Sequence, residues 1–359
     1  MTHEWIARMR VPGAALRGGE LALCLTLCLL GSAANAVTLT TFDPVGSNET
    51  HPAGINASGE ITGYYRDNTE AGHGFVRTPE GTITSFDPAG STFTQPTAID
   101  SNGVSTGAYN GNTGPTHGFV RTADGTITSF DPAGSTVTFP QSIDAQSGIV
   151  GYFIHGKRTM RGFLRSTHGK ILTIDFPGAT GTEPFAVNSA GTITGLYFDS
   201  SKVGHGFVRG SDGNFTSFDA PNAIFTVAIS IDAKGRITGN YTDSGQVVHG
   251  FVRAANGAIS SFDPAGSVAT SALSINAVGT IAGLYTDGSN VVHGFVRTSK
   301  GVFTSFDPSG STSTDPASIN DTGAITGSFV DGSHVTHGFV RAKGRVTRNV
   351  AEAESKGSE

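Results

Sequence analysis

HGFVRTPEGTITSFDPAG, residues 73–90, decides the fold, because near-copies of it return along the chain at a fixed spacing. The aspartate of its Ser-Phe-Asp-Pro motif keeps one register from Asp43 to Asp307, and an Ile-Asn/Asp pair does so from Asn56 to Asn320. Seven copies without a net insertion predict a single repeat domain. The arginine that closes Gly-Phe-(Val/Leu)-Arg returns every 44 residues, at Arg77, Arg121, Arg165, Arg209, Arg253, Arg297 and Arg341.

Each copy reads as four short strands joined by turns. In the first copy the strands are expected at 53–55, 60–65, 73–77 and 82–86, and a longer connection then runs to about Pro96. Four antiparallel strands in a unit of about 40–45 residues are typical of a propeller blade. We therefore predict an all-β fold, a seven-bladed β-propeller of four-stranded blades.

The two ends of the repeat tract indicate how the ring closes. Residues 38–43 form an orphan fourth strand before the first complete copy. We predict that this N-terminal strand completes the last blade and so covers an edge that would otherwise pair with other chains. The alternative is that residues 345–350 take that place or add a fifth strand. The propeller domain is expected at 37–350, and 351–359 is expected to be a disordered tail.

Residues 1–36 have the pattern of a signal peptide. A basic region with Arg8, Arg10 and Arg17 precedes an apolar run, Leu21–Leu30, and Ala34-Asn35-Ala36 has the form of a cleavage site. The apolar run is short for a membrane span, which needs roughly 20 residues, although a retained anchor is the alternative. We expect a secreted, periplasmic or extracellular protein with no integral membrane span after cleavage.

The composition narrows the partners. Both cysteines lie in the first 36 residues, so the mature chain would fold without disulfides. Without that segment, which holds three Arg and two Glu, the chain has 20 basic and 27 acidic residues and a formal charge of −7. This balance argues against general binding to nucleic acid or anionic membrane. A monomer without cofactors is expected.

The repeat resembles the HAF-type extracellular repeat family, named for a His-Ala-Phe strand, a short turn and a Gly-x-Ile/Val-x-Gly strand. Here the tripeptide is His-Gly-Phe, as at residues 73–75, and residues 275–279 match the Ile-Asn strand with its glycine turn. The resemblance covers about residues 38–341. It implies export and a propeller-like repeat, and it brings no catalytic residues. Two departures are Gly in place of Ala and Arg where a tryptophan often ends the strand.

Six histidines share one repeat position, and they are interpreted as structural. Equivalent residues on separate blades point to separate places unless they line the central channel, and a third-strand position lies outside it. The expected partner of each histidine is the aspartate of Ser-Phe-Asp-Pro at the same end of the adjacent strand. The six are His73, His117, His205, His249, His293 and His337.

A ring of Asn and Asp is predicted at one end of the channel. Three of its members are carboxylates, Asp100, Asp144 and Asp232. Together with the amide oxygens around them they could attract Ca²⁺. The other interpretation is that each side chain caps its own Asx-x-x-Gly turn.

The third copy departs most from the pattern. Its segment between the second and third strands carries His155, Lys157, Arg158 and Arg161, where other copies carry an aspartate. We consider these four residues a candidate anion-recognising patch, against the alternative of an ordinary solvated loop. Ligand binding that is unchanged after Lys157→Glu with Arg158→Glu would refute the patch.

Two functions are compatible with the sequence. One is an exported, non-catalytic propeller that recognises an extracellular ligand, a glycan or a protein, through one loop face. The alternative is a propeller enzyme of the lyase or glycosidase type that acts on an extracellular polymer. The sequence lacks nucleophile elbows, phosphate loops and zinc-protease motifs, so no catalytic residue is assigned.

Overall fold

A computed structural model describes residues 37–156 and 159–343. The chain divides into two units, of which one is Leu39–Arg341 and the other holds Met1–Thr38 and Ala342–Glu359. In the latter, the Thr38 hydroxyl donates a hydrogen bond to the carbonyl of Ala342 at 3.3 Å. The predicted signal peptide (1–36), the alternative closing strand (345–350) and the tail (351–359) fall outside the described residues. The repeats lie in the unit Leu39–Arg341.

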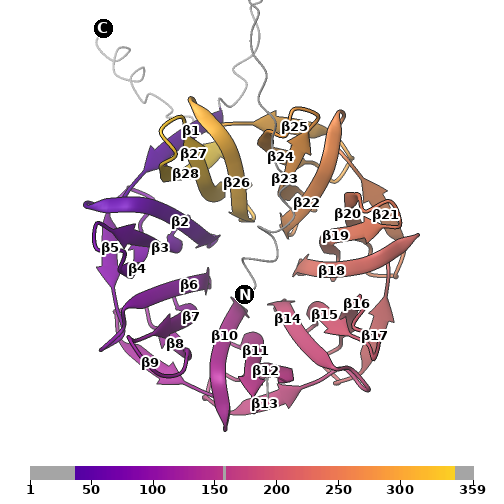
Figure 1. The fold of residues 1–359 in the computed structure, drawn as a ribbon, viewed down its shortest axis with the longest axis horizontal. Coiled ribbons are helices and arrows are strands. Elements are labelled where there is room, and N and C mark those ends of the chain that lie inside the picture. Colours follow the sequence, from indigo (N-terminus) through magenta and orange to yellow (C-terminus); the bar gives the residue numbers. More distant parts are fainter. Residues whose placement is uncertain (1–36, 157–158, 344–359) are drawn as a thin grey trace, which may run out of the picture. The chain divides into compact units, whose positions relative to one another are not determined.

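The described residues form 28 strands and no helix, which confirms the all-β class. The strands pair in antiparallel sets of four, and each set has the order of the chain: first, second, third and fourth strand. Figure 1 shows the sets arranged around a common centre, with the first strand of each nearest to it. The sets are β2–β5, β6–β9, β10–β13, β14–β17, β18–β21, β22–β25, and β26–β28 with β1.

The strand bounds repeat from set to set. The first strands are β2 (Ser47–Ile55), β6 (Phe93–Ile99), β10 (Ser135–Ile143), β14 (Gly181–Val187), β18 (Ala223–Ile231), β22 (Ser267–Ile275) and β26 (Ser311–Ile319). The second strands are β3 (Ile61–Asp67), β7 (Ser105–Asn110), β11 (Ile149–His155), β15 (Ile193–Phe198), β19 (Ile237–Asp243), β23 (Ile281–Asp287) and β27 (Ile325–Asp331). The third strands are β4 (Gly72–Arg77), β8 (His117–Arg121), β12 (Thr159–Arg165), β16 (Gly204–Arg209), β20 (Val248–Arg253), β24 (Val292–Arg297) and β28 (Thr336–Lys343). The fourth strands are β5 (Ile83–Phe86), β9 (Ile127–Phe130), β13 (Ile171–Ile174), β17 (Phe215–Phe218), β21 (Ile259–Phe262), β25 (Phe303–Phe306) and β1 (Val37–Phe42).

The first strands are longer than predicted. The sequence indicated a strand only at 53–55 and a connection that lasts to about Pro96, whereas β2 begins at Ser47 and β6 at Phe93. Proline caused the error, because it normally argues against a strand. Pro52 lies within β2, beside a register shift against β3. A first strand is the inner edge of its sheet, where a missing N–H is tolerated.

Phenylalanines hold neighbouring sets together. The third strand of every set buries one phenylalanine completely, Phe75 in β4 for example. The phenylalanine at the end of the preceding fourth strand meets it edge-to-face, except before Phe207, where Ile174 takes that place. The Phe42 and Phe75 ring centroids are 6.0 Å apart. Burying such a side chain stabilises a fold by about 1.5–3 kcal/mol. The core is therefore divided among the junctions between sets.

The ring closes where the N-terminal strand meets the last set. β1 pairs with β28, as predicted for the orphan strand. His337 binds Asp43 at 2.7 Å across 294 residues of sequence. On the other side of this set, the Asn320 amide donates to the carbonyl of Asn56 at 2.8 Å. The first and last repeats thus contact each other as neighbours do elsewhere in the ring.

Candidate functional site

The recurring histidines bind the aspartates predicted for them. His73 Nδ1 donates to Asp87 Oδ2 at 2.7 Å, and Thr94 donates to Asp87 Oδ1 at 2.6 Å. His73 Nε2 also lies 3.4 Å from Asp67 Oδ2. Burial lowers the pKa of His73, but hydrogen bonds and charge from Asp87 and Asp67 raise it by more, so the net shift is upward. The same pair occurs at His117, His205, His249, His293 and His337.

In the third copy Arg161 takes the place of this histidine. Its Nε and Nη2 both donate to Asp175 Oδ2, at 2.8 and 2.6 Å. The guanidinium thus makes the contact that a histidine makes elsewhere, and its charge is balanced by that carboxylate. Arg161 was assigned to the anion-recognising patch, and the structure gives it a partner within its own set.

The other patch residues are placed only in part. His155 is exposed at the end of β11, and its ring meets Phe153 edge-to-face at 6.4 Å. Lys157 and Arg158 lie outside the described residues. The patch therefore stays a prediction, with His155 at the end of β11 and Arg161 within β12, opposite Phe153.

Each of the repeated arginines packs over a phenylalanine. The Arg77 guanidinium lies 4.8 Å from the centre of the Phe42 ring, and Arg165 lies at the same distance from Phe130. Burial lowers the pKa of Arg77. A half-buried guanidinium is attracted to the face of an aromatic ring and stacks on it.

The aspartates of the Asn/Asp ring cap their own turns, as in the second interpretation. Asp100 Oδ1 accepts hydrogen bonds from the backbone N–H groups of Asn102 and Val104 at 2.8 and 2.9 Å. Asp144 and Asp232 make the same two bonds in their own turns. The described residues contain no cluster of three or more His, Cys, Asp or Glu that could hold a metal. The Ca²⁺ hypothesis stays untested by this geometry.

The asparagines of this ring also join neighbouring sets. The Asn56 amide donates to the carbonyl of Asp100 at 3.0 Å, and Asn188 contacts Asp232 in the same way. An aspartate has no N–H group and cannot donate such a bond. After Asp232, Arg236 of the same set connects to the next set instead, by donating to the carbonyl of Ala277 at 2.9 Å. A cavity of about 210 Å³ opens among these turns. Asn56, Asp100 and Asn320, which line it, already make hydrogen bonds within the framework.

Within one strand, a constant position adjoins a variable one. The constant position is always a threonine of 0–1% exposure: Thr50, Thr94, Thr138, Thr182, Thr226, Thr270 and Thr314. The next position holds seven different residues: His51, Gln95, Phe139, Glu183, Val227, Ser271 and Asp315. Successive side chains of a strand point to opposite faces of the sheet. One face of each inner strand therefore carries the framework, and the other carries the variation.

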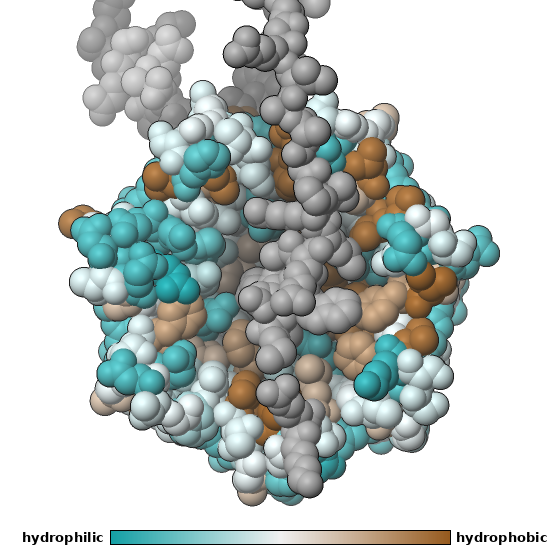
Figure 2. Space-filling model, in the orientation of Figure 1, coloured by the Kyte–Doolittle hydropathy of each residue, from teal (hydrophilic) through white to brown (hydrophobic). Residues whose placement is uncertain are grey.

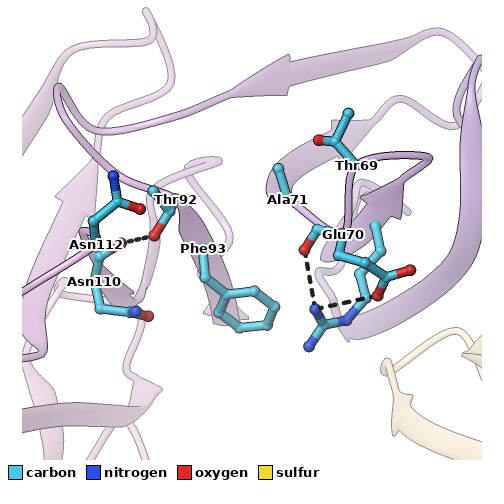
Figure 3. A pocket seen from close by; sticks show the side chains of 8 residues that line it. Thr69, Glu70, Ala71, Thr92, Phe93, Asn110 and Asn112 are labelled. Carbon is cyan, nitrogen blue, oxygen red and sulfur yellow. Dashed lines mark hydrogen bonds and ion pairs between the residues drawn. The ribbon is translucent and has the colours of Figure 1, made fainter.

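A cavity lies where two neighbouring sets meet. It measures about 490 Å³, between the loop that follows β3 and the start of β6. Figure 3 shows Asn110, Asn112 and Thr92 on one side of Phe93, and Glu70, Ala71 and Thr69 on the other. Arg66 completes the lining, with its guanidinium 4.8 Å from the centre of the Phe93 ring.

A second layer of side chains fixes this lining. Glu49 Oε2 lies 3.7 Å from Arg66 Nε and 3.3 Å from His51 Nε2. His51 stacks on Tyr64 at 4.7 Å, and Tyr64 meets Phe93 edge-to-face at 5.2 Å. Burial lowers the pKa of His51 and raises that of Tyr64 to about 12. Both rings are therefore uncharged at neutral pH.

Reading each copy by itself missed this cavity. Arg66 lies near the end of the second strand of one set and Phe93 begins the first strand of the next, so no motif contains both. Aligning the copies would have shown the signal. The residues equivalent to Arg66 are Asn110, Ile154, Phe198, Thr242, Thr286 and Val330. Those equivalent to Phe93 are Val137, Gly181, Phe225, Ala269, Ser313 and Glu49.

The surface of this face is uneven. Figure 2 shows hydrophilic side chains gathered over β2 and β3, and apolar ones over β18 to β22 on the far side of the ring. Ile224, Val247 and Val268 are 43%, 38% and 47% exposed. A framework that repeats so closely therefore presents different chemistry from one set to the next.

Comparisons with known proteins identify the fold. No family model and no curated protein matches the chain. Among solved structures, it is similar to the β-propeller domain of the Trilobed protease from Pyrococcus furiosus, with a TM-score of 0.56 and 8% identity over 81% of this chain and 95% of that one. The fold is a β-propeller. A lectin from Burkholderia pseudomallei gives a TM-score of 0.52 and 9% identity, over 83% of this chain and 97% of that one.

The propeller also resembles part of a larger enzyme. One of two prolyl endopeptidases gives a TM-score of 0.59 and 12% identity, over 79% of this chain but only 47% of that one. At such identities the likeness shows the propeller fold alone. Among the residues that the structure describes, no helix is long and apolar enough to cross a membrane.

Proposed function

We propose that the chain is an exported, seven-bladed β-propeller, of the HAF-type repeat family, that binds an extracellular ligand through the face holding the Arg66–Phe93 cavity. One observation carries the proposal. The buried threonine of the inner strand is constant in every copy, whereas the positions of Arg66 and Phe93, which line the cavity, change from copy to copy. A scaffold needs the constant face, and a recognition surface needs the variable one.

The test uses residues 37–359 on a glycan array and on immobilised extracellular polymers, followed by hydrogen exchange of the complex. We expect retention without degradation, and protection of amides in β2, β3, β6 and the loop after β3. The Asn/Asp turns at the other end of the channel serve as the internal control and should exchange as before. Protection confined to those turns, or release of shorter products, contradicts a binding role for the first face.

The enzymatic alternative has one observation in its favour. Glu183, at the variable position of β14, is 4% exposed, and burial raises its pKa to about 7, where a general acid works well. Its Oε1 lacks a hydrogen bond among the described residues. Lyases and glycosidases need a second catalytic group beside the first. If the polymer screen does find degradation, Glu183→Gln should abolish it while leaving retention intact.

A further inference from the structure

From the Arg66–Phe93 cavity we infer that the ligand is an uncharged, hydroxyl-rich molecule, a neutral saccharide, that packs against Phe93 and hydrogen-bonds to the polar groups on either side. This inference rests on the proposed binding function and names its ligand class.

Charge around the cavity argues against an anion. Arg66 is the cation of the lining, but Glu49 lies 3.7 Å and Glu70 4.0 Å from its guanidinium. Arg66 Nη1 also donates to the backbone carbonyl of Glu70 at 3.1 Å. With His51 uncharged, two carboxylates face one guanidinium and leave a local charge of about −1. An acidic ligand would have to displace a carboxylate from Arg66.

A cation is disfavoured for a different reason. An aromatic ring attracts cations to its face, and acids nearby would strengthen that attraction. Here the Arg66 guanidinium already lies 4.8 Å from the Phe93 centroid. A second cation at the same ring would be repelled by the first.

The remaining chemistry suits a polyhydroxylated ligand. The half-buried Phe93 ring supplies, where Arg66 leaves it uncovered, apolar area for the C–H face of a sugar ring. On one side, Asn110 and Asn112 offer amide donors and acceptors, and on the other the carboxylate of Glu70, with 77% of its side chain exposed, is a strong acceptor for hydroxyls. A volume of about 490 Å³ lies within the range of about 300–1,000 Å³ for small-ligand sites.

Phe93 is held in place before any ligand arrives. Its ring rests on the backbone of Gly72, where a Cβ would collide with it. Tyr64 meets its edge at 5.2 Å, and Arg66 covers part of the ring. A fixed platform of this kind loses little conformational entropy on binding.

The experiment compares neutral hexose oligosaccharides with uronic-acid oligosaccharides of the same length. We expect binding of neutral members only. Phe93→Ala should weaken it at least about tenfold, equivalent to about 1.4 kcal/mol. Arg66→Thr and Asn112→Ala should also weaken it. The first two changes use residues that this chain carries at the equivalent positions Ala269 and Thr242, which favours an intact fold.

Phe225→Ala is the matched control, because it alters the same repeat position in a set away from the cavity. It should bind neutral saccharides within about twofold of the parent. Asn112 is exposed, so its substitution stays informative if Phe93→Ala fails to fold. Preference for uronic acids, or affinity unchanged in both Phe93→Ala and Asn112→Ala, overturns the inference. If hydrogen exchange still places a ligand on this face, the proposed function survives that result; if no saccharide or polymer is retained, both fall.

Discussion

His73 shows how a repeated residue links stability to pH. In the folded chain it lies between Asp87 and Asp67, and its pKa is raised above the ordinary 6.5. The pKa values of His249, His293 and His337 are raised in the same way, by acids that outweigh burial. Protonated histidine is therefore favoured by folding.

The acids of these clusters titrate in the opposite sense. Hydrogen bonds from the Thr69 hydroxyl and backbone lower the pKa of Asp67 to about 2. An acid whose pKa is lowered by folding stabilises the fold above its unfolded pKa of 3.8, and that contribution is lost as pH falls through the folded pKa. A raised histidine stabilises fully below 6.5, and its contribution is lost as pH rises through the folded pKa.

We predict a maximum of thermal stability between about pH 4 and pH 6.5, with a fall on both sides. Melting temperatures from pH 3 to pH 9 measure it. Arg161 suggests the control, because an arginine already takes this position in the third set. Replacing His73, His249, His293 and His337 by arginine should flatten the fall above pH 6.5. A melting temperature that increases from pH 6 to pH 8 in the parent would contradict the assignment.

At the scale of strands, the closest approach lies between the first two strands of each set. Gly63 in β3 faces the bulged part of β2, and a Cβ there would collide with the carbonyl oxygen of His51. The equivalent glycine of every set has the same neighbour. Glycine at this position lets the inner strand bend toward the centre of the ring.

Gly63→Ala should therefore lower the free energy of unfolding by about 1–3 kcal/mol, since strands in contact must separate to admit the methyl group. Unfolding in urea, monitored by circular dichroism, gives the free energy of unfolding of each variant. Gly288→Ala is the control, because nothing lies within 4 Å of the added Cβ. It should change stability by less than about 1 kcal/mol. Equal losses in both variants would show that the collision at Gly63 is relieved at little cost.

Strand positions and their contacts differ in how far the sequence predicts them. The third and fourth strands follow from Gly-Phe-Val-Arg and Ser-Phe-Asp-Pro, and the His73–Asp87 pair follows because both lie at one end of one hairpin. The early start of β2 cannot be predicted from the sequence, because Pro52 is compatible with a strand only at a sheet edge, and the sequence does not show that β2 is an edge. The cavity does not follow either, because Arg66 and Phe93 meet only when two sets pack together.

For the whole molecule, stability depends on a strand that comes from the other end of the chain. β1 covers the outer edge of the last set, and Phe42 packs edge-to-face on Phe75 while lying against Gly338. Its loss would expose both a strand edge and the aromatic contact to the first set.

Deletion of residues 37–42 should lower the melting temperature and cause concentration-dependent association through the uncovered edge of β28. Light scattering and differential scanning calorimetry measure the two effects. Deletion of 351–359 is the control and should leave both unchanged. Phe42→Ala separates packing from pairing: because Phe42 is only partly buried, it should cost less than the about 3–5 kcal/mol of a core phenylalanine, without association. A monomeric, fully stable chain without 37–42 would rule out closure by β1.

The pairing of β1 with β28 also imposes an order of events on a newly made chain. Synthesis begins at the N-terminus, yet Asp43 meets His337 only after 294 further residues have emerged. Contacts so distant in sequence are slow to form, because a long loop must close first. β1 is synthesised first but can pair with β28 only at the end of synthesis, whereas every other set can assemble while the ring is still open. We therefore expect ring closure between β1 and β28 to be the last step of folding, and the nascent protein to be exposed to proteases and to other chains until that step is complete.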